Sequence, residues 1–194
     1  MVLSAFFIAS CEKASERIDD FFVHFATVVK QNETLLFQLD NNKLLFPKEL
    51  KDYKAEEGQR VVINYVPLKG DTVKIRNVSN IFTGAIDEKG YPEKYRTDPV
   101  KIQSVWVSGH YLNMILEVEY HSKPHTIGLL RDTGSATADL YFSHSANDDP
   151  PGYPKKMYAS FSLQALRKPG ASPIPFRVFI QTHQGLREFE FELK

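Results

Sequence analysis

Hydrophobic residues alternate with polar ones, or stand in short blocks, from Phe21 to the end of the chain. A period of two residues is typical of β-strands, whereas an amphipathic helix repeats about every 3.6 residues. No long helical period is visible, and only residues 162–167 suggest one helical turn. The pattern therefore predicts an all-β protein.

The first half of this region contains five predicted strands separated by turn signals such as Asp40-Asn41-Asn42 and Lys69-Gly70-Asp71. Five strands with one polar connection, at residues 49–55, are typical of a small closed barrel of the OB type. We therefore expect an OB-like β-barrel domain over residues 21–86. Its strands are predicted at residues 21–29, 35–39, 43–46, 60–66 and 72–82.

A segment rich in turn-forming and charged residues, 87–98, then interrupts the pattern and predicts a linker. Strands resume beyond it, and seven strands spaced by about 8–12 residues are typical of an Ig-like β-sandwich. We expect this second domain at residues 99–194. Its strands are predicted at residues 100–107, 111–121, 126–130, 136–144, 157–163, 176–182 and 186–193.

The N-terminal residues carry the pattern of a bacterial lipoprotein signal. Residues 2–9 are apolar apart from Ser4. They are too few to span a bilayer, which takes roughly 20 residues, but suit the apolar part of an export signal. Ile8-Ala9-Ser10-Cys11 then resembles the lipobox, in which a branched apolar residue and two small residues precede the cysteine that receives the lipid.

We therefore expect residues 1–11 to form the signal peptide and lipobox cysteine, with lipidation at Cys11. Residues 12–20 are polar and predict a tether between lipid and fold. A buried apolar segment with a core cysteine is the alternative. Cys11 is the only cysteine, so the chain can form no internal disulfide.

Charge is balanced, with 24 basic and 24 acidic residues. A nucleic-acid-binding protein normally carries a basic excess in at least one domain, because phosphate neutralisation supplies most of its affinity. Neither half of this chain shows one. We therefore expect no nucleic-acid partner, although single-strand binding by an OB-like barrel is a known use of that fold.

Several spaced sequence blocks resemble the NigD-like lipoproteins. Residues 58–65 (GQRVVINY) and 73–83 are similar to the first domain of that family, and residues 98–102 and 105–114 to the start of the second. The resemblance implies a small envelope lipoprotein of Bacteroidetes, with an OB-like domain followed by a β-sandwich. It implies no established activity, cofactor or catalytic residue. The family name comes from a bacteriocin gene cluster, so a bacteriocin-associated or immunity-type role is one alternative.

Catalytic motifs are not evident. The chain has no Gly-x-Ser-x-Gly motif, no phosphate-binding glycine loop and no dinucleotide fingerprint. We expect no catalytic residue, cofactor or metal. The polar candidates are histidines and aspartates of predicted loops, as metal ligands, and glutamates that alternate along strands, as a glycosidase pair; solvated turns and a solvated strand face are the competing interpretations. The candidates are His121, His125, His144, Asp148, Asp149, Glu117, Glu119, Glu188, Glu190 and Glu192.

Aromatic residues are the remaining candidates, because exposed rings stack on sugars or grip protein partners. Trp106, Tyr111 and Tyr153 are predicted as ligand contacts, with core and hairpin packing as the competing interpretation. The resulting hypothesis is a non-enzymatic, lipid-anchored envelope protein, facing the periplasm or the cell surface from the outer membrane, that binds an unknown protein or glycan. An envelope hydrolase acting on glycan or peptide is the alternative, and it requires the histidines or two glutamates to converge in a polar pocket. The sequence leaves the oligomeric state open.

Overall fold

The computed structural model describes residues 21–194 except residues 33, 51–52, 55, 168 and 171–172. The predicted signal, Cys11 and the predicted tether lie outside the described residues. Within them the chain forms strands and one short 3₁₀ helix, η1 (Gln164–Leu166), so the all-β prediction is confirmed. No helix in the described part is long and apolar enough to cross a membrane.

The N-terminal domain is a closed five-stranded barrel, as predicted, with the strand order β1-β2-β3-β5-β4. Alternation builds its core: Val61, Ile63 and Tyr65 are buried along β4, while the residues between them are half-buried. Closure rests on a short parallel contact between β3 and β5. The strands are β1 (Phe22–Gln31), β2 (Thr34–Leu39), β3 (Leu44–Pro47), β4 (Arg60–Pro67) and β5 (Thr72–Asn80).

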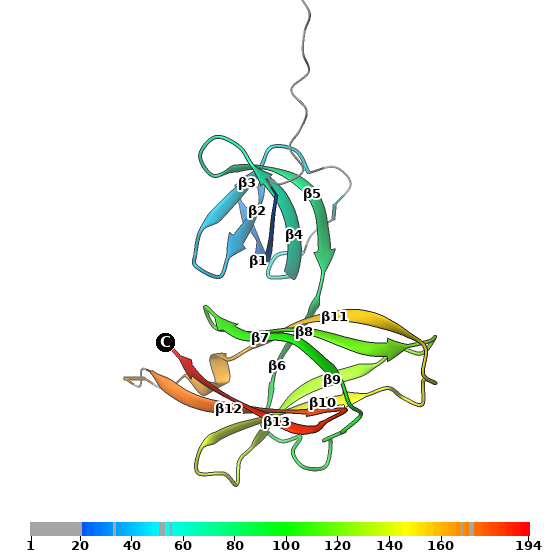
Figure 1. Cartoon of the computed structure of the whole chain (residues 1–194). Coiled ribbons are helices and arrows are strands. Elements are labelled where there is room, and N and C mark those ends of the chain that lie inside the picture. Colours follow the sequence, from blue (N-terminus) through cyan, green and yellow to red (C-terminus); the bar gives the residue numbers. More distant parts are fainter. Residues whose placement is uncertain (1–20, 33, 51–52, 55, 168, 171–172) are drawn as a thin grey trace, which may run out of the picture.

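The C-terminal domain is a β-sandwich built from one eight-stranded sheet in the order β13-β12-β10-β9-β6-β11-β8-β7. In Figure 1, β7, β8 and β11 form the layer that faces the barrel. The strands are β6 (Phe82–Asp87), β7 (Lys101–Ser108), β8 (Tyr111–Tyr120), β9 (Thr126–Asp132), β10 (Ala138–Ser145), β11 (Tyr153–Ser162), β12 (Ile174–Thr182) and β13 (Gly185–Leu193).

Strand β6 joins the two halves of the sandwich. Its residues 82–85 pair in parallel with β11, and Ile86 and Asp87 pair in parallel with β9. The chain therefore passes from one layer to the other within a single strand. The apolar side chains of both layers, including Leu112, Phe142 and Phe161, form one continuous core.

The structure differs from the predicted domain boundary at β6. We expected one strand over residues 72–82 and a barrel domain reaching residue 86, but β5 ends at Asn80 and β6 already belongs to the sandwich. No glycine or proline separates the two strands, so the sequence does not signal the change of sheet. The predicted linker also packs on the sandwich, because Thr97 pairs with His144 in a β-bridge.

Candidate functional site at the domain junction

A buried arginine lies where the barrel meets the sandwich. Arg60 begins β4, and its side chain is fully buried. Its guanidinium forms a bidentate ion pair with Asp40, which lies in the turn after β2. Nη1 lies 2.6 Å from Oδ1, and Nη2 lies 3.1 Å from Oδ2. Such paired geometry is what makes a buried charge tolerable.

The remaining donors of Arg60 reach the other strands of the junction. Nη1 also donates to Thr27 Oγ1 on β1 at 3.1 Å. Nη2 donates to Asn113 Oδ1 on β8 at 3.0 Å, and Nε donates to Ser160 Oγ on β11 at 3.3 Å. A guanidinium has five N–H groups. All five therefore have an acceptor, and two of these acceptors belong to the sandwich.

Aromatic rings surround this polar network. Tyr111 lies against the guanidinium, with Arg60 Cζ 4.1 Å from the ring centroid. On β1, Phe25 meets Trp106 edge to face, with ring centroids 5.0 Å apart, and also contacts Tyr158 at 6.2 Å. The two domains thus share a packed and hydrogen-bonded contact that fixes their relative orientation.

Two clefts open on either side of Asp40. The first has a volume of ≈ 350 Å³ and combines the rings of Phe25, Trp106 and Tyr158 with the polar side chains of His24 and Asn41. The second has a volume of ≈ 280 Å³ and is lined by Asp40, Tyr111, Gln38, His110 and Arg167, among others. Clefts between domains that mix aromatic and polar groups are common ligand sites.

The structure places two of the three predicted aromatic contacts at this junction. Trp106 lines the first cleft and Tyr111 the second. Tyr153 lies elsewhere: it begins β11, is exposed, and contacts Tyr120 edge to face. Sequence reasoning missed Arg60, Asp40 and Asn113. The sequence does contain a signal for two of them. Arg60 is a charged residue at the start of a strongly apolar strand, and Asn113 is a polar residue within another.

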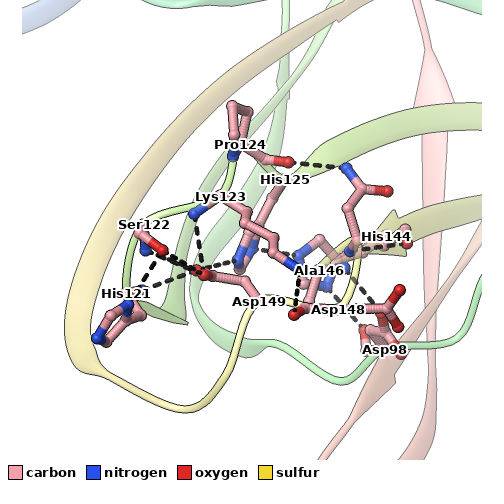
Figure 2. Close-up of polar contacts among 12 residues, drawn as sticks. Asp98, His121, Ser122, Lys123, Pro124, His125, His144, Ala146, Asp148 and Asp149 are labelled. Atoms are coloured by element: carbon pink, nitrogen blue, oxygen red, sulfur yellow. Dashed lines mark hydrogen bonds and ion pairs between the residues drawn. The ribbon is translucent and has the colours of Figure 1, made fainter.

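A second polar cluster lies in the sandwich and contains all three candidate histidines, His121, His125 and His144 (Figure 2). His125 Nδ1 and His144 Nε2 are 2.9 Å apart, and His144 Nδ1 lies 2.9 Å from the carbonyl oxygen of Asp98. A carbonyl oxygen only accepts, so His144 Nδ1 donates to it, and in the neutral ring His144 Nε2 accepts from His125 Nδ1. Burial lowers the pKa of His144, the Asp98 carbonyl partly opposes this, and His125 lowers that pKa further.

Asp149 anchors the same cluster. Its carboxylate accepts hydrogen bonds from the backbone N–H groups of His121, Ser122 and Lys123, and it lies 3.4 Å from His125 Nε2. Desolvation would raise the pKa of Asp149. The three N–H donors and His125 outweigh it, so the pKa lies well below its usual range. The carboxylate thereby ties the β8–β9 loop to the β10–β11 loop.

This arrangement lacks the geometry of a hydrolytic triad. In a triad, one histidine contacts both the nucleophile and the orienting carboxylate. Here Ser122 Oγ contacts His121 at 3.1 Å, whereas the carboxylate of Asp149 contacts His125. The side chains of His125 and His144 are only 6% and 3% exposed. What the contacts of the cluster show is that Asp149 links the β8–β9 loop to the β10–β11 loop.

Metal ligands are not assembled in the described residues, where no group of three or more His, Cys, Asp or Glu side chains is placed to hold a metal ion. Glu117 instead pairs with Lys101, its Oε1 lying 2.9 Å from Nζ. Glu188 likewise contacts Arg177 at 3.2 Å. These glutamates therefore contact cations on the strand surface.

Comparison with protein families matches both domains. A model of the NigD-like N-terminal OB domain matches residues 25–81, and a model of the NigD-like C-terminal beta sandwich domain matches residues 84–193. The second match alone covers more than half of the chain. This chain belongs to the NigD-like family. The predicted resemblance is therefore confirmed.

Solved structures show the same NigD-like architecture. A protein named as toxin related from Parabacteroides distasonis is 26% identical, with a TM-score of 0.80 over 90% of this chain and 94% of that one. A NigD-like immunity protein from Bacteroides caccae is 23% identical, with a TM-score of 0.71 over 89% and 97%. A protein named as a lipoprotein from Bacteroides fragilis is 14% identical, with a TM-score of 0.66 over 90% and 97%. None of the curated proteins compared with this NigD-like chain matches it.

Proposed function

We propose that this NigD-like chain is a lipid-anchored protein of the bacterial cell envelope that binds a protein or glycan at its domain junction and catalyses no reaction. The observation that carries the proposal is the cleft lined by Phe25, Trp106 and Tyr158, with His24 and Asn41 at its edge. Aromatic rings supply a large apolar contact area. The polar groups beside them fix the orientation of a bound ligand by hydrogen bonding.

The rigid junction supports a binding role. Because Arg60 is hydrogen-bonded to both domains, the two walls of the cleft are held in place before a ligand arrives. A preorganised site loses less conformational entropy on binding than a mobile one. In the polar cluster, by contrast, the side chains of His125 and Asp149 are buried and contact each other.

The lipid anchor is supported by the lipobox-like Ile8-Ala9-Ser10-Cys11 and by the similar structure named as a lipoprotein. In cells, Cys11→Ser should move the protein from the membrane to the soluble fraction. Mass spectrometry of the wild-type N-terminus should find a lipid-modified Cys11. An unmodified Cys11 in membrane-associated protein would contradict the anchor.

Ligand binding is tested by cross-linking the purified chain to detergent-solubilised envelopes and repeating the assay with each captured candidate in pure form. Val23→Arg places a long charged side chain at an exposed position of the cleft, and it should abolish capture. Trp106→Ala should weaken capture at least tenfold, by loss of ring contact area. Tyr153→Ala, an exposed aromatic away from the junction, is the control. Equal capture by all variants would refute the junction as the binding site.

An immunity role is the second candidate, favoured by the similar NigD-like immunity protein and the similar protein named as toxin related. In that case the ligand is a bacteriocin or its target. Expression of the chain in a bacteriocin-sensitive Bacteroidetes strain should then protect it, and Val23→Arg should remove protection. Survival that is independent of the chain would reject this candidate.

A further inference from the structure

Exposed apolar side chains gather at the end of the barrel that points away from the sandwich. We call the group Phe21, Phe22, Phe46 and Leu68 the apolar tip; these side chains are between 40% and 49% exposed. The start of β1 and the β4–β5 loop both lie at that end in Figure 1.

Strand pairing brings the members of the apolar tip together. Phe22 is opposite Tyr65 near the end of β4, and the two rings are stacked with centroids 5.9 Å apart. Phe46 is opposite Thr72 at the start of β5, and Leu68 donates its N–H to the carbonyl oxygen of the same threonine. Phe22, Phe46 and Leu68 therefore lie at the same end of the barrel, where Phe21 directly precedes β1.

This grouping is unusual for the molecule. Among the described residues, eight large hydrophobic side chains are exposed, and half of them belong to the apolar tip. Single exposed apolar residues need no explanation, but a cluster of them usually marks a contact surface. The cluster therefore needs a partner that accepts aromatic and aliphatic groups.

Two basic side chains lie beside the apolar tip. The guanidinium of Arg76 lies 5.7 Å from the ring centroid of Phe21, and Lys69 follows Leu68 in the exposed β4–β5 loop. The acidic residue of that loop, Asp71, is paired with Lys43 at 3.1 Å. Apolar groups flanked by cations are the combination that favours an anionic lipid surface.

The short distance along the chain between Cys11 and Phe21 indicates what the apolar tip contacts. Phe21 follows Cys11 by ten residues, a distance of about 35 Å even when fully extended. Phe21 is itself part of the apolar tip. A bilayer that holds a lipid on Cys11 therefore lies within reach of the apolar tip, and the sandwich lies on the far side of the barrel.

We propose that the apolar tip rests on the anchoring bilayer, with Phe21, Phe22, Phe46 and Leu68 among the head groups and Lys69 and Arg76 against anionic phospholipid. The inference builds on the proposed lipid anchor. In this orientation the barrel faces the membrane. The junction clefts and the sandwich face away from the membrane. The lipid attaches the chain to the bilayer, and the contact of the apolar tip adds a second attachment that orients the barrel.

Vesicle flotation tests the surface without the lipid. The chain from residue 11 onward, which keeps every described residue, carries Cys11→Ser and is mixed with vesicles of phosphatidylethanolamine and phosphatidylglycerol. We expect co-flotation that weakens at high salt, because exposed charges are screened. Phe46→Ser together with Leu68→Ser should lower vesicle binding about tenfold, by loss of buried apolar area.

The matched control is Tyr153→Ser together with Leu186→Ser. These side chains are 57% and 52% exposed and belong to the sandwich, so vesicle binding should stay unchanged. Equal loss in both double variants, or no flotation of the parent chain, would overturn the proposed surface while leaving a lipid on Cys11 untouched. Conversely, an unlipidated Cys11 in cells alongside tip-dependent flotation would reject the anchor but keep the surface.

Discussion

At the scale of single residues, Arg60 shows how one charge is accommodated between two β-domains. Its side chain would be costly to bury alone, but Asp40 neutralises it and three further acceptors complete its hydrogen bonds. The network is specific because each acceptor comes from a different strand or turn. Loss of any one partner leaves a buried donor unsatisfied.

Asp40→Ala is therefore expected to destabilise the protein by about 3 kcal/mol, because it leaves the buried guanidinium without its counter-ion. The free energy of unfolding, measured with urea, checks this. Asp71→Ala is the control, since its ion pair with Lys43 is half-exposed and such pairs contribute about 0–1 kcal/mol. Similar losses for both variants would show that the buried pair has no special role.

At the scale of elements, the β7–β8 hairpin contributes several contacts to the barrel. It supplies Trp106, Tyr111 and Asn113, and its turn residue Gly109 has a φ of 59°. A Cβ atom on Gly109 would lie 3.0 Å from the carbonyl oxygen of Asp40. The turn therefore needs glycine both for its backbone and for its approach to the barrel.

Gly109→Ala should lower the free energy of unfolding by more than Gly70→Ala does. Both glycines have positive φ, but a Cβ on Gly70 meets nothing within 4 Å. Backbone strain should lower the free energy of unfolding of each variant by about 1 kcal/mol. Only Gly109→Ala also pushes the hairpin away from Asp40. Denaturant unfolding of the two variants isolates the second contribution, and equal losses would contradict it.

Elements were predictable from the sequence where alternation and turn residues agree, as in the barrel strands and in β8. The passage from β5 to β6 was not, because apolar and polar residues continue across it without a break. Asn113 alternates with the apolar residues of β8 and is on the same face as Glu117 and Glu119, yet it is fully buried. Its burial depends on the barrel covering that face, and the sequence does not encode this locally.

At the scale of the whole molecule, stability should depend on pH through His144. Its pKa is lowered by burial in the folded state, so the unfolded chain binds more protons between that folded pKa and the unfolded value of about 6.5. Stability is therefore fully present above pH ~6.5 and is lost as pH falls through the folded pKa. His125, Asp98 and Asp149 are the polar groups facing this cluster.

Urea unfolding at a series of pH values below 7 measures this dependence. His144→Gln should flatten the fall in stability toward acid, because the titrating imidazole is gone. His183→Gln, in the exposed β12–β13 turn, should leave the slope as it is. An unchanged slope in His144→Gln would assign the acid sensitivity to other groups.

Ile81 is the only residue between β5 and β6, and it is buried. The connection between the barrel and the sandwich is therefore one residue long. If the N-terminus is held by the membrane and the sandwich by a ligand, tension enters at β1 and crosses to β4 through their antiparallel ladder. The force then acts parallel to the strands and is shared by several backbone hydrogen bonds. The barrel and the sandwich should therefore resist extension as one rigid unit.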